Sequence, residues 1–286
     1  MAINMKPFPE QAALFARCSE YAYLPEKEGK AKFKELGFKA TFIDNDGSQA
    51  YWLVNDDDLV IVCRGTQPTE FKDIAADLKA LPVKSSTGIG KTHLGFKESV
   101  DDIWSDVVDL AHDYGKTRTV WCAGHSLGAA MATILAYRLQ RADNLPSPQA
   151  LFTYGSPRCG DKEYIKGMEA TGLLAYRFVN NADIVARVPL WPFHHLAGAM
   201  YINHYGNLRT LTFKQSFKDV WRGFFVGLKR KEGINFFTNH SITRYAERLE
   251  HWAKGVVLTR ELTILQKIDI IFPFRENTSI LLVRKQ

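Results

Sequence analysis

The fold of this chain is decided by the stretch Val120-Trp121-Cys122-Ala123-Gly124-His125-Ser126-Leu127-Gly128-Ala129-Ala130-Met131-Ala132. An apolar run ends in a turn, and a small-residue pattern typical of a closely packed helix follows at once. Gly124 and Gly128 remove the side chains that would clash in so sharp a turn. The stretch therefore predicts strand, turn and helix, with the Ser126 hydroxyl presented at a helix N-terminus as a nucleophile. A glycine-rich turn with a capping serine is the alternative.

Length and composition indicate a folded protein with a large core. The chain has 286 residues, of which 46% are hydrophobic and 24% charged. We expect one domain over residues 1–286. The four cysteines are scattered and form no C-x-x-C pair, so we expect no disulfide, no zinc site and no redox motif.

Charge and targeting signals narrow the classes of partner. The net charge of +6 favours an acidic surface such as anionic lipid, but no nucleic-acid-binding motif is present. Residues 1–7 lack the apolar region of a cleavable signal peptide. No apolar run approaches the roughly 20 residues of a membrane span. We expect a protein that is cytoplasmic or exported by a signal-independent route, with no transmembrane segment.

Strand-like and helix-like segments alternate along the chain. Helical patterns occupy residues 9–24, 26–36, 96–114, 127–142 and 241–254, and strand patterns occupy 38–44, 49–55, 59–63, 150–154 and 173–179. Asn45-Asp46-Gly47 predicts a hairpin between the first two strands. The alternation that follows predicts an α/β fold with a mostly parallel central sheet flanked by helices.

A short amphipathic helix is expected at residues 70–78. Flexible-looking segments flank it at Gln67–Thr69 and Ser85–Gly90. It follows Arg64-Gly65-Thr66, a turn that ends a buried strand and could present N–H groups. This order favours a lid over residues 68–90. A surface helix packed on the core is the alternative.

A serine nucleophile needs a base and an orienting carboxylate. In one recurrent chain order, the acid follows the serine and the histidine comes last. Asp183 is the first carboxylate after the strand 173–179, and it is favoured over Asp161 and Asp143.

His240 lies in a polar turn that opens a helix, a position that suits a catalytic base. The other histidines after Ser126 are His194, His195, His204 and His251. Their spacing fits no metal site, and packing or surface roles are expected for them. We expect His125 to be a structural residue that points away from the Ser126 hydroxyl.

The chain resembles the fungal-type (class 3) lipases, a family of α/β-hydrolases, over roughly residues 10–254. The segments that carry the resemblance are Ile61–Thr66, the helix at 70–78, Thr92–Phe96, Gly124–Ala129, Thr153–Arg158, Val179–Val185 and His240-Ser241 with Tyr245. Residues 255–286 extend past the family core.

The resemblance implies a site and an activity. It implies Ser126, Asp183 and His240 as the catalytic triad, with an oxyanion hole from Thr66 and Leu127. It implies no cofactor and no metal. The expected function is that of a triacylglycerol lipase acting through an acyl-enzyme. The alternatives are a phospholipase A1, a carboxylesterase or feruloyl esterase for soluble esters, and a non-catalytic lipid-binding protein.

A basic, aromatic stretch at residues 217–231 has apolar side chains at helical spacing. We favour a helix whose aromatic face packs on the core or over the acyl-binding groove. Alternatively, such a helix could lie on an anionic lipid surface, which the lid at 70–78 would also meet. Lipid or ester substrates, met at a lipid–water interface, are therefore the expected partners.

Overall fold

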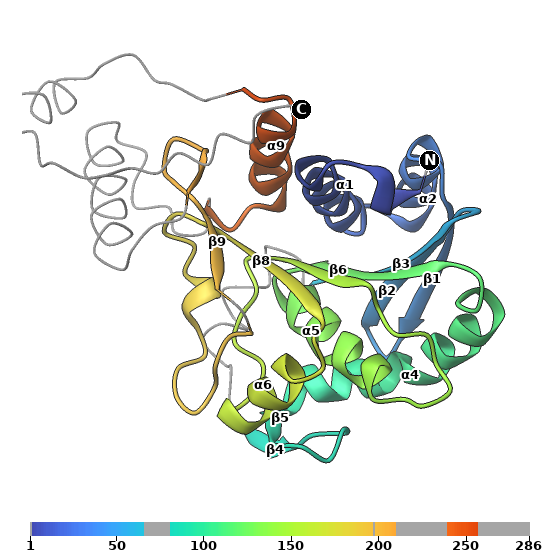
Figure 1. Cartoon of the computed structure of the whole chain (residues 1–286), viewed down its shortest axis with the longest axis vertical. Helices are drawn as coiled ribbons and strands as arrows, with labels where there is room; N and C mark the ends of the chain where they lie inside the picture. Colours follow the sequence, from blue (N-terminus) through green and yellow to red (C-terminus); the bar gives the residue numbers. More distant parts are fainter. Residues whose placement is uncertain (1, 66–80, 197, 210–238, 257–286) are drawn as a thin grey trace, which may run out of the picture.

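An eight-stranded mixed sheet runs through the protein, with helices on both faces (Figure 1). The computed structural model describes residues 2–65, 81–196, 198–209 and 239–256. The strand order is β1-β2-β3-β6-β7-β8-β9-β10. The strands are β1 (Lys39–Asn45), β2 (Ser48–Val54), β3 (Asp58–Cys63), β6 (Thr119–His125), β7 (Ala150–Tyr154), β8 (Leu174–Asn180), β9 (Ala199–Ile202) and β10 (Leu208–Arg209).

The middle of the sheet is parallel and both edges are antiparallel. Strands β3, β6, β7, β8 and β9 pair in parallel. The pairs β1–β2, β2–β3 and β9–β10 are antiparallel. Because β3, β6, β7 and β8 run the same way, the loops that follow them meet at one edge of the sheet. We call this the carboxyl edge.

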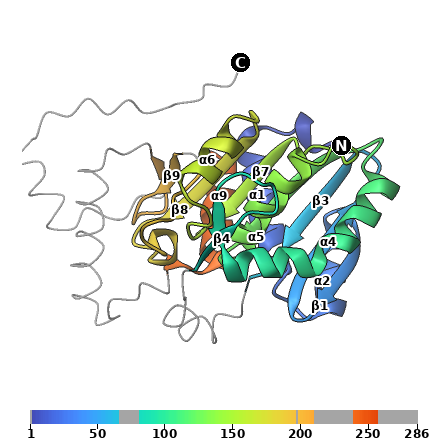
Figure 2. The ribbon, with the colours of Figure 1, turned by 90° about the horizontal axis from the view of Figure 1, so that it is seen from below.

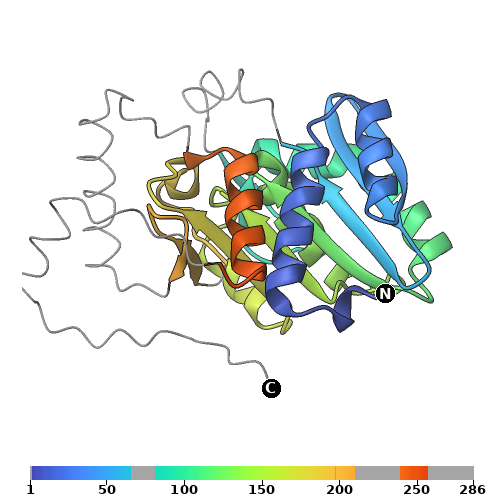
Figure 3. The same ribbon diagram turned by 90° about the horizontal axis from the view of Figure 1, so that it is seen from above.

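Two helical layers cover the sheet. On one face lie α1 (Phe8–Tyr21), α2 (Glu26–Glu35) and α9 (Ile242–Ala253), side by side in Figure 3. The other face carries α4 (Leu94–Tyr114), α5 (Leu127–Gln140) and α6 (Lys162–Glu169), seen from below in Figure 2. The described residues also form two short 3-10 turns, η1 (Ile3–Met5) before α1 and η2 (Val185–Arg187) after β8. All residues of β3 are buried because this strand has a hydrophobic core on each face.

The expected α/β fold with a mostly parallel sheet is confirmed. The predicted hairpin is present: β1 and β2 pair across Asp46 and Gly47, whose φ angles of 52° and 82° suit a type I′ turn. The predicted helices and strands that fall within the described residues are present within a few residues of their expected bounds. The short pair β9–β10 went unpredicted because its strands have four and two residues.

The segment Ser85–Gly90, expected as a flexible arm, is instead the turn of a hairpin. It joins β4 (Pro82–Lys84) to β5 (Lys91–His93). The Ser85 hydroxyl donates to the carbonyl oxygen of Ile89 at 2.6 Å, and the Ser85 N–H donates to the Gly90 carbonyl at 3.1 Å. Polar residues that looked like a loose connection thus satisfy one another in a closed turn.

Several predicted features lie outside the described residues. They are Thr66, the lid helix at 70–78, the stretch at 217–231 and the extension beyond residue 256. The single domain over residues 1–286 stays a prediction. Within the described ranges, no helix is long and apolar enough to cross a bilayer.

Candidate active site

Ser126 occupies a strained turn between β6 and α5. Its φ and ψ angles are 60° and −129°, a combination that non-glycine residues rarely adopt. The side chain is only 1% exposed. The sequence-predicted elbow is therefore present, with the serine at its apex.

The two glycines of the turn are required by close backbone contacts. A Cβ atom on Gly124 would lie 2.3 Å from the carbonyl oxygen of Gly128. One on Gly128 would lie 2.2 Å from the carbonyl oxygen of Cys63. Strand β6, helix α5 and the end of β3 can pack this tightly only because these side chains are missing.

Leu127 begins α5, directly after Ser126. The first N–H groups of an α-helix have no acceptor within the helix, so the Leu127 N–H can donate to an oxyanion. The positive end of the helix dipole adds to this effect. Thr66, the other expected donor, lies outside the described residues.

Strand register brings the second part of the site beside the elbow. His125 pairs with Tyr154, and Tyr154 with Phe178, across the parallel strands β6, β7 and β8. The Ser126 N–H donates to the Tyr154 carbonyl at 3.0 Å, which extends this ladder past the strand ends. The loops that carry Ser126, Gly155 and Asp183 thus emerge next to one another.

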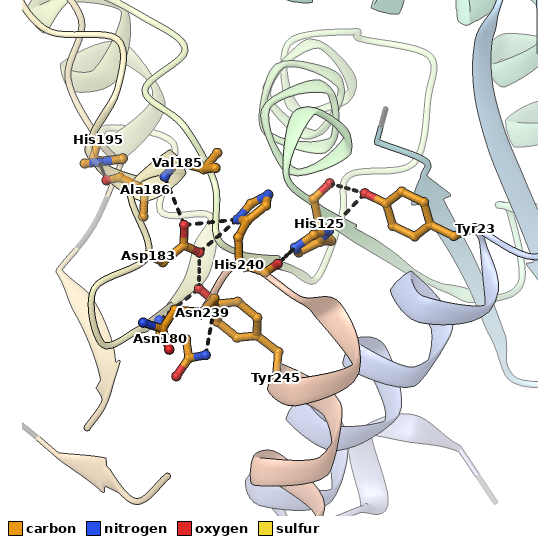
Figure 4. Close-up of polar contacts among 10 residues, drawn as sticks. All are labelled: Tyr23, His125, Asn180, Asp183, Val185, Ala186, His195, Asn239, His240 and Tyr245. Carbon is orange, nitrogen blue, oxygen red and sulfur yellow. Dashed lines mark hydrogen bonds and ion pairs between the residues drawn. The ribbon is translucent and has the colours of Figure 1, made fainter. Parts of the chain in front are cut away.

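Asp183 is fully buried and its carboxylate is surrounded by donors (Figure 4). His240 Nδ1 lies 3.0 Å from both carboxylate oxygens. The Val185 N–H donates to Oδ1 at 2.9 Å, and the Tyr245 hydroxyl donates to Oδ2 at 2.6 Å. A buried carboxylate is stable only with such partners. Here they fix its position against His240.

The bond to Asp183 orients the His240 ring. Because the carboxylate accepts the proton on Nδ1, the neutral ring has Nε2 free of a proton and able to accept one. Ser126 Oγ makes no hydrogen bond to any described residue. The serine–histidine contact is therefore open in this conformation, as is common before substrate binds.

His125 joins the elbow to the His240 loop. Its Nε2 donates to the His240 carbonyl at 2.7 Å, and its Nδ1 lies 2.9 Å from the Tyr23 hydroxyl. The two histidine rings have centroids 4.4 Å apart. Burial first, and then His240, hold the pKa of His125 well below its ordinary value. His125 is therefore a neutral structural residue, as expected, and not a base.

Helix α9, which lies on the face of the sheet opposite to α5, positions His240. Its Tyr245 hydroxyl also accepts from the Asn180 N–H at 2.8 Å. Asn180 Nδ2 donates in turn to the Asn239 carbonyl at 2.7 Å, next to His240. Helix α1 holds α9 through Arg17, whose Nη2 lies 2.8 Å from Glu250. Helix α1, near the start of the chain, thus holds α9 in place, and α9 in turn holds His240 beside Asp183.

The aspartates and histidines that the sequence did not favour as catalytic residues lie in ordinary structural or surface positions. Asp161 caps α6 by accepting from the Tyr164 N–H at 2.8 Å. Asp143 is exposed. His195 donates to the Ala186 carbonyl at 2.7 Å, and burial lowers its pKa to about 3. No group of His, Cys, Asp and Glu side chains suited to a metal ion occurs among the described residues.

Sequence reasoning missed the supporting residues. Tyr245 was noted only as part of a resembling segment, and Tyr23 had no signal because its partner is 102 residues away. Gly155 has φ +58°, and a Cβ there would lie 2.6 Å from Asp183 Oδ2 and 2.8 Å from His240 Nδ1. The sequence did contain a signal for Gly155, since a glycine directly after a strand often marks a place where another group packs closely against the backbone.

The comparisons with known proteins agree with this geometry. The family model for lipase (class 3) matches residues 60–193. Over these residues, just under half of its length, the chain is similar to the class 3 lipases. The solved triacylglyceride lipase of Rhizomucor miehei superposes with a TM-score of 0.60 at 25% identity, covering 68% of this chain and 79% of that one.

Two curated relatives show how far the similarity extends. The lipase of Rhizomucor miehei is 35% identical over 150 residues, which cover 50% of this chain and 41% of the relative. The chloroplastic phospholipase A(1) DAD1 of Arabidopsis thaliana is 32% identical over 90 residues, covering 31% of this chain and 20% of the relative. The match thus spans less than half of each of these two relatives.

The neutral, buried His125 predicts a pH dependence of stability. Its pKa is lowered in the folded state, so as pH falls below about 6.5 the unfolded chain takes up a proton that the folded chain does not. We expect this residue to reduce the free energy of unfolding as the pH falls, with a slope that rises from about 0.7 kcal/mol per pH unit at pH 6.5 to about 1.4 kcal/mol per pH unit near pH 5. Urea unfolding at several pH values measures the slope.

Two variants test whether His125 causes this pH dependence of the free energy of unfolding. His125→Gln retains a donor and an acceptor but cannot be protonated, so it should flatten the slope by that amount. His112→Gln, on the exposed side of α4, is the matched control and should leave the slope as it is. An unchanged slope in His125→Gln would show that His125 is not the group responsible.

Proposed function

We propose that this protein hydrolyses carboxylic esters of lipids, triacylglycerols in particular, through an acyl-enzyme on Ser126. The observation that carries the proposal is the buried Asp183–His240 pair, held at 3.0 Å beside a strained serine turn. These are the parts that serine acyl transfer requires, and they lie at the carboxyl edge of a parallel sheet.

The mechanism assigns one role to each residue. His240 Nε2 takes the Ser126 proton as the hydroxyl attacks the ester carbonyl, and returns it to the leaving alcohol. Asp183 holds the ring and stabilises the imidazolium that forms. The Leu127 N–H, with Thr66, donates to the tetrahedral oxyanion, and one such donor contributes about 3–4 kcal/mol. Water, activated by His240, then releases the fatty acid.

The substrate class is supported by the family and by the names of relatives. The similar proteins from Rhizomucor miehei and Rhizopus niveus are lipases. We propose that the predicted lid at 70–78 and the basic stretch at 217–231 meet the lipid–water interface. Both bear apolar and charged side chains at helical spacing.

A phospholipase A1 or an esterase for soluble esters uses the same chemistry on a different substrate. The similarity to phospholipase A(1) DAD1 favours the first. The charged face of the lid helix, with Glu70, Lys72 and Asp73, favours the second. A non-catalytic lipid-binding protein is the alternative without chemistry.

Hydrolysis rate against substrate concentration tests the proposal. A short-chain p-nitrophenyl ester and a long-chain triglyceride are assayed across each solubility limit, with a diacyl phosphatidylcholine in parallel. We expect the triglyceride rate to rise steeply above its solubility limit. Ser126→Ala should reduce all rates by at least about 10⁴-fold because the nucleophile is removed.

Each other result points to a specific alternative. Saturation below the solubility limit, without activity on long chains, would indicate a soluble-ester esterase. Preference for the phospholipid would indicate a phospholipase. Rates equal in wild type and Ser126→Ala would contradict the proposed chemistry altogether.

Gly155 gives a sharper test of the site geometry. Gly155→Ala places a methyl group against both Asp183 and His240, so we expect kcat on the short-chain ester to fall by about 100-fold. KM should change little because the contact is with the catalytic pair and not with substrate.

Gly172→Ala is the matched control. Gly172 also has a positive φ, +74°, but a Cβ there meets nothing within 4 Å. Both variants carry the left-handed backbone cost of about 1–2 kcal/mol, measurable by thermal unfolding. Only Gly155→Ala should lose activity, and a wild-type kcat in that variant would contradict the assigned geometry.

A further inference from the structure

The loop after Asp183 ends in an exposed apolar corner. Trp191 is 87% exposed and Leu190 71% exposed, and Ile184 at the start of the loop is also exposed. A single exposed apolar residue needs no explanation, but a tryptophan and a leucine together at one corner are typical of an interaction site. We call Leu190 and Trp191 the apolar corner.

The apolar corner is a built structure. The Phe193 N–H donates to the Leu190 carbonyl at 3.1 Å, which closes a turn with Trp191 inside it. Arg158 Nη1 donates to the Pro189 carbonyl at 2.9 Å, and the Arg158 N–H donates to the Val188 carbonyl at 2.9 Å. Hydrogen bonds thus fix the backbone of this loop, while the side chains of Leu190 and Trp191 face solvent.

The far end of the loop is anchored in the core. Phe193 is only 2% exposed, and its ring centroid lies 5.6 Å from that of His93. The His194 N–H donates to the Gly160 carbonyl at 2.7 Å. The loop therefore buries Phe193 in the core but exposes Trp191, only two residues earlier, to solvent.

The corner lies on the side of the protein where substrate must arrive. Its loop leaves the carboxyl end of β8, and it carries the buried Asp183 before reaching Leu190. Ser126 follows the carboxyl end of β6, which is separated from β8 by β7 and runs parallel to both. A surface bound by Leu190 and Trp191 would therefore meet the edge of the sheet that holds the catalytic candidates.

Positive charge flanks the apolar corner. Arg187 is exposed, and it lies close enough to Arg158 to lower the pKa of that guanidinium, after the larger effect of burial. Neither arginine forms an ion pair with a carboxylate of the described residues. An apolar tip beside the exposed Arg187, which has no ion pair among the described residues, is complementary to an anionic lipid surface.

We propose that Leu190 and Trp191 insert into the interfacial region of an anionic phospholipid surface, with Arg187 at the headgroup phosphates. Tryptophan favours this region because its ring is largely apolar while its N–H stays hydrated. Two side chains at a convex corner offer far less area than the roughly 1,200 Å² of a stable protein interface. The biological sense of this attachment rests on the proposed lipid-ester function, but the attachment itself does not require the chemistry at Ser126.

Vesicle co-sedimentation of the full chain tests this attachment. The Ser126→Ala protein is used so that no lipid is hydrolysed, with vesicles of phosphatidylcholine alone or mixed with phosphatidylglycerol. We expect Trp191→Ala and Leu190→Ser each to weaken partition onto the anionic vesicles by about tenfold. Arg187→Gln should weaken binding only to the anionic vesicles, and added salt should reduce that difference.

Leu174→Ser is the matched control. Leu174 is also exposed, at 48%, but it lies at the amino end of β8, away from the carboxyl edge. Its replacement should leave partition unchanged. When Ser126 is retained, the Trp191→Ala variant should hydrolyse the soluble short-chain ester at the wild-type rate. This result would separate membrane attachment from catalysis.

Two outcomes would overturn the proposal. One is equal binding by Trp191→Ala, Leu190→Ser and the parent protein. The other is a Trp191→Ala variant that loses self-association in sedimentation velocity without losing vesicle binding, which would assign the corner to a second copy of this chain. Absence of ester hydrolysis would contradict the proposed function but would leave the binding result to stand on its own.

Discussion

The structure of this site depends on the burial of one carboxylate. Asp183 is removed from water, which costs several kcal/mol unless donors replace the lost hydration. Those donors come from three parts of the chain: the turn that follows it (Val185), the loop before α9 (His240) and the first turns of α9 (Tyr245). Satisfying the carboxylate therefore brings the end of the described chain to the carboxyl edge and sets the orientation of the histidine ring.

Close backbone packing provides the other half of the site. Gly124 and Gly128 let β6, α5 and the end of β3 approach within van der Waals contact, and the strained serine is held between them. Gly155 leaves room for the Asp183–His240 pair on the neighbouring strand. His125 then links the two halves, since it is the last residue of β6 and its ring donates to the His240 carbonyl. Its neutral ring, held by Tyr23, keeps this link free of charge beside the catalytic pair.

Sequence reasoning found the elements with local signals and missed those that depend on distant contacts. The elbow, the Asp-Gly hairpin and the alternation of strands and helices follow from glycine geometry and hydrophobic periodicity, which act over a few residues. The choice of Asp183 and His240 followed from chain order and strand ends, and the structure brings these two residues together. Tyr23 and Tyr245 act across 102 and 62 residues, so no local pattern could assign their partners. The turn at Ser85–Gly90 looked flexible because its residues are polar or glycine. In the structure these residues hydrogen-bond to one another, and polarity alone does not distinguish a closed turn from a loose one.

The central claim is that the Asp183–His240 pair activates Ser126 for acyl transfer. The most direct measurement is the site of covalent modification by diethyl p-nitrophenyl phosphate, a reagent that phosphorylates activated serines much faster than ordinary side chains. After proteolytic digestion and mass spectrometry, this account predicts one diethylphosphoryl group, on the peptide that contains Ser126, formed far more slowly in His240→Ala. Modification of a different residue, or the same rate of modification of Ser126 without His240, would contradict it.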